Sequence, residues 1–117
     1  MYSTMQNSPL TVAELLRYAV DVHGDRTVST ATGDGFRHAT YREIGKQAAR
    51  LANALRRLGI DGDQRVATFM WNNQEHFEAY AAVPSMGAVL HTLNIRLFPE
   101  QIEFVAYEAE DKVVIAD

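Results

Sequence analysis

Hydrophobic positions in the second half of the chain alternate between the spacing of a strand and that of a helix. Apolar runs of strand length lie at residues 65–70, 88–92 and 112–116. Stretches with helical spacing separate them, at residues 73–82 and 99–109. Strands that alternate with helices need crossover connections, which give a parallel sheet covered by helices. Residues 64–117 are therefore predicted to form a β-α-β-α-β unit of the α/β class, with a mainly parallel sheet.

The first half of the chain, residues 1–63, predicts a helix, a hairpin and a second helix. Thr11 and Glu14 form a capping-box pattern before a helix that Gly24 ends. Asp34-Gly35 lies between two strand-like runs, which is a hairpin signal. A second capping box, Thr40 with Glu43, opens a long amphipathic helix that ends at Gly59. Its predicted buried stripe is Ile44, Ala48, Leu51, Ala52, Leu55 and Leu58. We treat residues 1–117 as a single segment with these two parts.

Two further helices can be given caps and buried faces. Asn72, with Glu75 three residues later, is the predicted cap of the helix that follows the first parallel strand. The inner face of that helix is predicted to carry Phe77, Tyr80 and Ala81, which leaves His76 on the surface. Pro84 either ends the helix or kinks it. Pro99 suits the first turn of the last helix, whose predicted buried stripe is Ile102, Val105, Ala106 and Ala109.

Composition describes an ordinary globular protein of 117 residues, 47% hydrophobic and 22% charged. The net charge of −4 argues against a nucleic-acid binder, which would show a basic face. Cysteine is absent, which excludes disulfides and thiolate chemistry. The polar start of the chain lacks the pattern of a signal peptide, and polar residues interrupt the most apolar window. We expect a cytoplasmic protein without a transmembrane segment.

Ligands of parallel sheets bind beyond the carboxyl ends of the strands. Four residues follow the predicted strand ends or lie near them, and we take them as candidates for the wall of a substrate crevice: Trp71, Asn72, His91 and Asn94. The simpler alternative is that Asn72 caps a helix, Asn94 shapes a turn, and Trp71 and His91 pack against other segments. We assign no catalytic residue, because Glu43 has a capping role. We assign no metal ligand either, because no two histidines have a metal-site spacing.

Four segments in order, residues 39–44, 62–67, 72–77 and 87–102, resemble the amino-terminal part of the acyl-CoA synthetases. These belong to the AMP-forming, adenylate-forming ligase superfamily. The last segment, with Leu90-His91-Thr92-Leu93-Asn94, is similar to the fatty-acyl form of a family core motif. Ile95 departs from it, because a proline is common there. The resemblance implies an incomplete N-terminal portion of a larger ligase domain.

The same resemblance implies a reaction for the complete enzyme, a fatty-acid–CoA ligase. A carboxylate attacks ATP to give an acyl-adenylate, with magnesium offsetting the phosphate charge, and coenzyme A then displaces AMP. In the family a Ser/Thr/Gly-rich loop ending in Pro-Lys holds the phosphates, and it is absent here. The chain's two lysines, Lys46 and Lys112, lie outside any glycine-rich loop. We therefore expect the 117-residue chain to act as scaffold and crevice wall, to hold no cofactor and to be inactive alone.

An alternative remains, because this fold hosts many functions. The chain could be a stand-alone, non-catalytic, flavodoxin-like binding or interaction module. A part of a larger domain should expose a large apolar surface, whereas a complete module should not. A part should also leave an open strand edge, near residues 112–117 or 65–70, through which two copies could form a homodimer.

Overall fold

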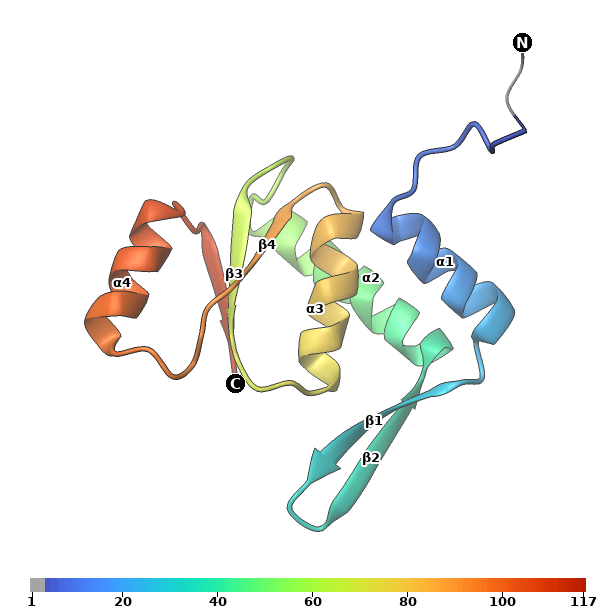
Figure 1. The fold of residues 1–117 in the computed structure, drawn as a ribbon, viewed down its shortest axis with the longest axis horizontal. Helices are drawn as coiled ribbons and strands as arrows, with labels where there is room; N and C mark the ends of the chain where they lie inside the picture. The colour runs from blue at the N-terminus through green and yellow to red at the C-terminus, as the bar shows by residue number, and fades with distance from the viewer. Residues whose placement is uncertain (1–3) are drawn as a thin grey trace.

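The computed structural model describes residues 4–117, which contain four helices and five strands (Figure 1). The helices are α1 (Val12–His23), α2 (Tyr41–Arg57), α3 (Gln74–Ser85) and α4 (Pro99–Glu108). The strands are β1 (Thr27–Thr32), β2 (Gly35–Thr40), β3 (Arg65–Phe69), β4 (Val89–Thr92) and β5 (Val113–Ala116). The predicted order of elements is confirmed. No helix in this described part is long and apolar enough to cross a membrane.

The three later strands form a parallel sheet in the order β4-β3-β5, which confirms the predicted α/β fold class. Val66 on β3 is paired with Leu90 on one side and with Val113 on the other. Of the two places offered for an open edge, residues 112–117 contain the edge strand β5, whereas residues 65–70 do not form an edge because β3 is central. The edges are β4 and β5, since each pairs with β3 alone.

Helices cover both faces of this sheet, with α2 and α3 on one side and α4 on the other (Figure 1). The core lies between the sheet and the α2–α3 layer, where Leu55, Val66 and Val83 are at most 2% exposed. Helix α1 packs outside this layer against α2 and α3. Helix α4 has no buried residue, and its predicted stripe is only half-buried. The α2–α3 layer therefore carries most of the packing.

The β1–β2 hairpin projects from the body of the molecule (Figure 1). Its strands pair from Thr27 with Thr40 to Thr32 with Gly35, so the two-residue turn is Gly33-Asp34. Gly35 adopts a φ of 150°, which side chains disfavour. The radius of gyration is 16.2 Å, whereas a compact domain of this length has roughly 13 Å. The projecting hairpin, the outlying α4 and the extended segment before α1 all contribute to this shape (Figure 1).

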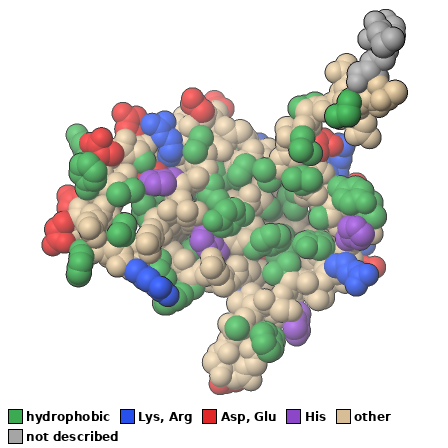
Figure 2. Space-filling model, viewed as in Figure 1, with side chains coloured by type: hydrophobic (Ala, Val, Ile, Leu, Met, Phe, Trp, Pro, Cys, Tyr) green, Lys and Arg blue, Asp and Glu red, His purple; other side chains and the backbone are tan. Residues whose placement is uncertain are grey.

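Hydrophobic side chains remain exposed over several elements. Figure 2 shows them gathered across the part of the viewed face where α1 and α3 lie. Leu15 of α1, for example, is 57% exposed. On the other side of the sheet, Phe104 and Tyr107 of α4 are 64% and 79% exposed. Apolar surface of this extent favours contact with further protein.

Both predicted capping residues at the first two helices are in place, but only one forms a full box. Thr40 accepts from the backbone amide of Glu43, whose carboxylate accepts from the amide of Thr40. Thr11 likewise accepts from the amide of Glu14, but the Glu14 carboxylate pairs with Arg17 instead. The predicted burial of Leu58 is wrong: α2 ends at Arg57, and Leu58 is 68% exposed.

Helix α3 begins one residue later than predicted. Its cap is Asn73, whose side chain accepts from the amide of His76, so the expected cap at Asn72 is wrong. The shift turns a different face inward, one that carries His76, Ala79, Ala81, Ala82 and Val83. His76 is therefore buried rather than exposed, while Phe77 and Tyr80 lie nearer the surface. Pro84 is inside the last turn, and the helix continues to Ser85.

Candidate functional site

A hollow of about 290 Å³ lies at the carboxyl ends of β3 and β4. Three of the four predicted crevice residues, Trp71, Asn72 and Asn94, line it together with Arg96. They meet here because β3 and β4 are parallel neighbours, which brings the loops after them to the same edge of the sheet. Trp71 is 65% exposed, so its indole forms part of an open rim.

The fourth predicted residue, His91, does not line this hollow. It lies within β4, and its Nδ1 is 2.8 Å from a carboxylate oxygen of Asp111, a side chain that is only 2% exposed. Asp111 lies between α4 and β5, so the pair joins the two edges of the sheet. His91 thus contacts Asp111, and its side chain does not line the strand-end hollow.

Sequence reasoning missed His76, which also lines the hollow. Its side chain is held by Thr68, because Nε2 and the Thr68 Oγ1 form a hydrogen bond of 2.9 Å. Thr68 is fully buried and His76 is 7% exposed. Its ring also packs against Tyr80, with centroids 5.0 Å apart. No local signal in the sequence marks it, because its partner Thr68 lies on β3 and is brought near only by packing.

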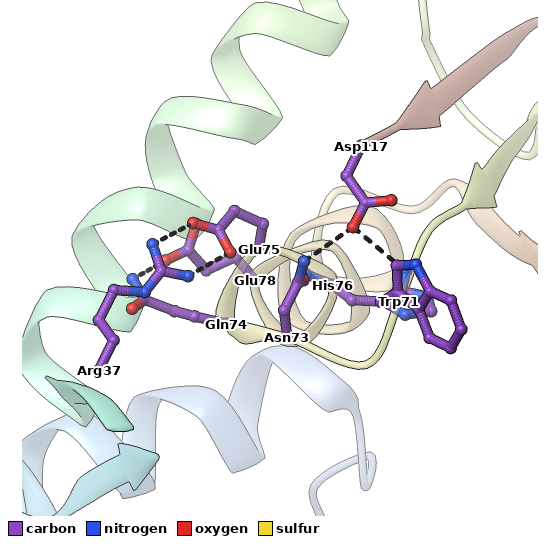
Figure 3. A network of polar contacts seen from close by, with 8 residues as sticks. All are labelled: Arg37, Trp71, Asn73, Gln74, Glu75, His76, Glu78 and Asp117. Atoms are coloured by element: carbon purple, nitrogen blue, oxygen red, sulfur yellow. Dashed lines mark hydrogen bonds and ion pairs between the residues drawn. The ribbon is translucent and has the colours of Figure 1, made fainter. Parts of the chain in front are cut away.

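Asp117 fixes the loop between β3 and α3 (Figure 3). Its carboxylate accepts from the backbone amide of Trp71 at 3.2 Å and from the Asn73 side-chain amide at 2.9 Å. Asn73 in turn accepts from the amide of His76 at 2.9 Å. The end of β5 is thereby joined to the start of α3, and the Trp71 backbone is held at the strand edge.

Arg37, Glu75, Gln74 and Glu78 form a second polar group at the start of α3 (Figure 3). The hydrogen bonds from Arg37 hold the pKa of the Glu75 carboxyl below its ordinary value. Burial raises the pKa of Glu78, and the hydrogen bond from Gln74 opposes that rise. The group attaches the projecting hairpin to α3.

The loop after β4 places a positive charge at the rim. Asn94 Oδ1 accepts from the backbone amide of Arg96 at 3.0 Å, which shapes the turn. Within residues 4–117, no carboxylate lies within ion-pair distance of the Arg96 guanidinium. Arg96 is exposed, so its charge is available to an anion that enters the hollow.

The described residues around the strand-end hollow do not provide a complete set of ligands for a phosphate group or a metal ion. No cluster of three or more metal-binding side chains occurs among the described residues. Lys46 lies on α2 and Lys112 precedes β5, so neither lysine reaches the strand-end hollow. These residues do not fit a magnesium–triphosphate site, and the hollow offers one cation and a mixed polar and apolar lining.

Comparison with known proteins gives relatives along the whole chain. A medium-chain-fatty-acid–CoA ligase of Ectopseudomonas oleovorans is 41% identical over 100% of this chain and 22% of its own length. A long-chain-fatty-acid–CoA ligase of Thermus thermophilus is 43% identical over 98% of this chain and 21% of its own. The solved N-terminal domain of FACL13 from Mycobacterium tuberculosis superposes with a TM-score of 0.85 at 27% identity. That match covers 92% of this chain and 27% of that one.

The chain spans about a fifth of the length of the curated relatives that it matches. The family model described as AMP-binding enzyme matches residues 16–117, which is nearly all of the chain. The three parallel strands, the Thr40–Glu43 capping box and the loops at the strand edge all fall within that match. The chain therefore belongs to the AMP-binding enzyme family and aligns with the amino-terminal part of its fatty-acid–CoA ligases.

Proposed function

We propose that the chain is the N-terminal scaffold segment of an ATP-dependent fatty-acid–CoA ligase. The observation that carries the proposal is the match of residues 16–117 to the AMP-binding family, with two fatty-acid–CoA ligases above 40% identity. In this proposal residues 1–117 are one segment of the larger adenylate-forming domain. Residues 1–63 supply two helices and the hairpin of that domain, and residues 64–117 supply part of its parallel sheet.

The complete ligase would join a fatty acid to coenzyme A in two steps, through an acyl-adenylate and with release of pyrophosphate and then AMP. The described residues do not form a triphosphate–magnesium site, so we assign that role to other parts of the ligase. Trp71, Asn72 and Asn94 are proposed to form one wall of the substrate crevice. His91 is left out of that wall because it is paired with Asp111.

The test begins with the source gene. An open frame that continues beyond codon 117 into a Ser/Thr/Gly-rich loop with a following lysine would support the proposal. The full product should then form fatty-acyl thioesters with ATP and coenzyme A, while the 117-residue chain should form none. A full product that binds ATP but forms no thioester with any fatty acid would overturn it. Fractionation of the source cells should place the ligase in the cytoplasm.

We also propose that the isolated chain forms a homodimer through β5. This strand is an edge of the sheet, and every second residue along it is exposed, including Val114 at 52%. An edge strand presents unpaired amides and carbonyls that can pair with another chain.

A further inference from the structure

A groove of about 420 Å³ lies between α1 and α2. It shares no lining residue with the strand-end hollow, so it is a separate feature of the surface. Its floor is apolar and comes from both helices, with Ala13, Leu16 and Val20 of α1 and Gly45 and Ala49 of α2. Three of these residues are glycine or alanine, so a helix placed in the groove can lie close to both α1 and α2.

The rim of this groove is mainly cationic. Three basic side chains and one carboxylate line it: Arg17, Arg42, Lys46 and Asp21. Arg17 and Arg42 each pair with an acidic neighbour on the surface. Lys46 makes no ion pair within residues 4–117. The charge of Lys46 is therefore available to a bound partner.

Arg50 continues the row of cations along α2. Arg42, Lys46 and Arg50 follow one another at intervals of four residues, which is about 6 Å along a helix axis. Acidic side chains at the same interval on a neighbouring helix would face them one by one. Helix α2 has a single acidic residue, Glu43, which the cap uses, although the net charge of the chain is −4. The basic surface is thus local to this helix and suits a negatively charged partner.

Ser85, the last residue of α3, also lines the groove. Its Oγ is buried and has no hydrogen-bond partner among the described residues. A buried hydroxyl without a partner is unfavourable, and a polar group of a molecule bound in the groove would relieve this. The observation is independent of the charges on the rim, and it also points to an occupant.

The lining of the groove favours a protein helix over a membrane surface. Amphipathic surfaces bind bilayers through bulky apolar side chains that insert among the lipids. The exposed apolar side chains of α1, such as Leu15 and Tyr18, do not line this groove. An apolar floor of small residues beside a row of cations matches the recognition of an amphipathic helix in a groove.

We propose that the α1–α2 groove binds an acidic amphipathic helix of a separate protein partner. Apolar side chains of that helix would pack on Leu16 and Ala49, and acidic side chains beside them would pair with Lys46 and Arg50. The proposal goes beyond the ligase function and does not depend on it, because the groove contains no residue of the proposed crevice wall.

A designed peptide tests the groove directly. The peptide has about 18 residues, enough for five helical turns. It carries leucines along one stripe, glutamates every four residues beside them and a fluorescein label. Fluorescence anisotropy gives its dissociation constant for the 117-residue chain. Binding should weaken as the salt concentration rises from about 0.05 to 0.5 M, because salt screens exposed ion pairs. A peptide with lysines in place of the glutamates, and a scrambled peptide of the same composition, should each bind at least about tenfold more weakly.

Variants of the chain separate the cations from the floor. Lys46→Glu should weaken binding about three- to tenfold, because it replaces an attraction with a repulsion. Lys112→Glu makes the same charge change before β5, outside the groove, and is the matched control that should change nothing. Ala49→Gln places a longer uncharged side chain on the floor and should weaken binding by a similar factor while the salt dependence remains. Circular dichroism identifies any variant that fails to fold, and Arg50→Glu then replaces Lys46→Glu.

The proposal is overturned if folded Lys46→Glu and Arg50→Glu bind the peptide as the wild type does, or if the lysine peptide binds equally well. Binding to phosphatidylglycerol vesicles but not to the peptide would overturn it in favour of a lipid surface. Loss of self-association in Lys46→Glu, measured by light scattering, would overturn it in favour of a second copy of this chain.

The full product of the gene completes the test. It should bind the peptide with the same dependence on Lys46. If it does not, although the 117-residue chain does, its own later segments fill the groove and the proposal of a separate partner is overturned. A full product that binds the peptide but forms no thioester would reject the ligase function and leave this proposal standing.

Discussion

Arg37 on β2 and Glu75 in the first turn of α3 are joined by two side-by-side hydrogen bonds. The two guanidinium nitrogens donate to the two carboxylate oxygens at 2.7 and 2.6 Å. The residues are 38 positions apart, and the pair connects the projecting hairpin to the helix whose start borders the strand-end hollow. The two-bond geometry gives this exposed pair more influence than a single contact would have.

The Arg37–Glu75 pair makes stability depend on pH in a defined direction. Because the pKa of Glu75 is lowered in the folded chain, its contribution is fully present above the ordinary carboxyl pKa. That contribution is lost as the pH falls through the lowered value. Arg37→Gln should lower the free energy of unfolding at neutral pH and leave it unchanged at low pH, where Glu75 is protonated. Urea unfolding at a series of pH values measures this, and an equal cost at every pH would contradict it.

The contribution of Glu78 to stability should change with pH in the opposite direction. Burial raises its pKa, so its charged form costs stability above that raised value and the cost disappears as the pH falls through it. Glu78→Gln removes the charge and keeps an oxygen that can accept from Gln74. We expect the variant to be slightly more stable at neutral pH, because Glu78 is only partly buried and solvent screens most of the penalty on its charge. Asp63→Asn, on the exposed turn before β3, is the control for loss of an acidic charge.

Thr68 and His76 should be coupled in stability. Thr68→Val keeps the shape of a fully buried side chain but leaves the His76 Nε2 without its partner, which costs about 1–3 kcal/mol. With both partners apolar the penalty is largely removed, so Thr68→Val with His76→Phe should cost less than the sum of the single variants. Strictly additive unfolding free energies would show that this hydrogen bond does not contribute.

Gly45 allows α1 to lie close to α2. A methyl group added there would lie 2.7 Å from Cγ2 of Val20, a side chain that is stiff at χ1. Gly45→Ala should lose on the order of 1 kcal/mol, because overpacking exceeds the gain in helix propensity. In a Val20→Ala background the same change should become neutral or stabilising. If Gly45→Ala is destabilising in both backgrounds, the close contact is not its cause.

Association through β5 should depend on concentration and on the edge itself. Light scattering of the isolated chain should show a dimer at high concentration, and Val114→Lys should suppress it, because charges on an edge strand oppose pairing. Tyr107→Lys adds the same charge to an exposed α4 position away from the edge and should leave association unchanged. A clean monomer at the highest concentration would end the dimer proposal.

The helices, the strands and their sheet could be predicted because the spacing of hydrophobic residues and the helix-capping residues are local signals in the sequence. Thr40 and Glu43 lie three residues apart, and the strand runs are bounded by turns. The inner face of α3 was mispredicted because the hydrophobic pattern places its aromatic side chains inside. The cap was mispredicted separately, because two adjacent asparagines can each accept from the first turn and Asn73 is the one that does. Small alanines then fill the inner face, and the aromatics that dominate the hydrophobic pattern lie at the rim.

The candidate site was partly predictable for a related reason. The parallel strands bring Trp71, Asn72 and Asn94 to one edge, and that follows from topology alone. His91 was misplaced because its partner, Asp111, is 20 residues away and is brought near only by the packing around the sheet. The roles of Thr68 and Asp117 depend equally on contacts between distant segments.

The central place of β3 also has a consequence during synthesis. Its pairing with β4 can form soon after residue 92 leaves the ribosome, but β5 emerges only after α4. Counting from Phe69 to Ala116, 47 residues must be added, which takes roughly two to nine seconds at cellular elongation rates. For that interval one side of β3 carries unsatisfied amides and carbonyls. The nascent chain would then be a substrate for chaperones that recognise exposed strand edges.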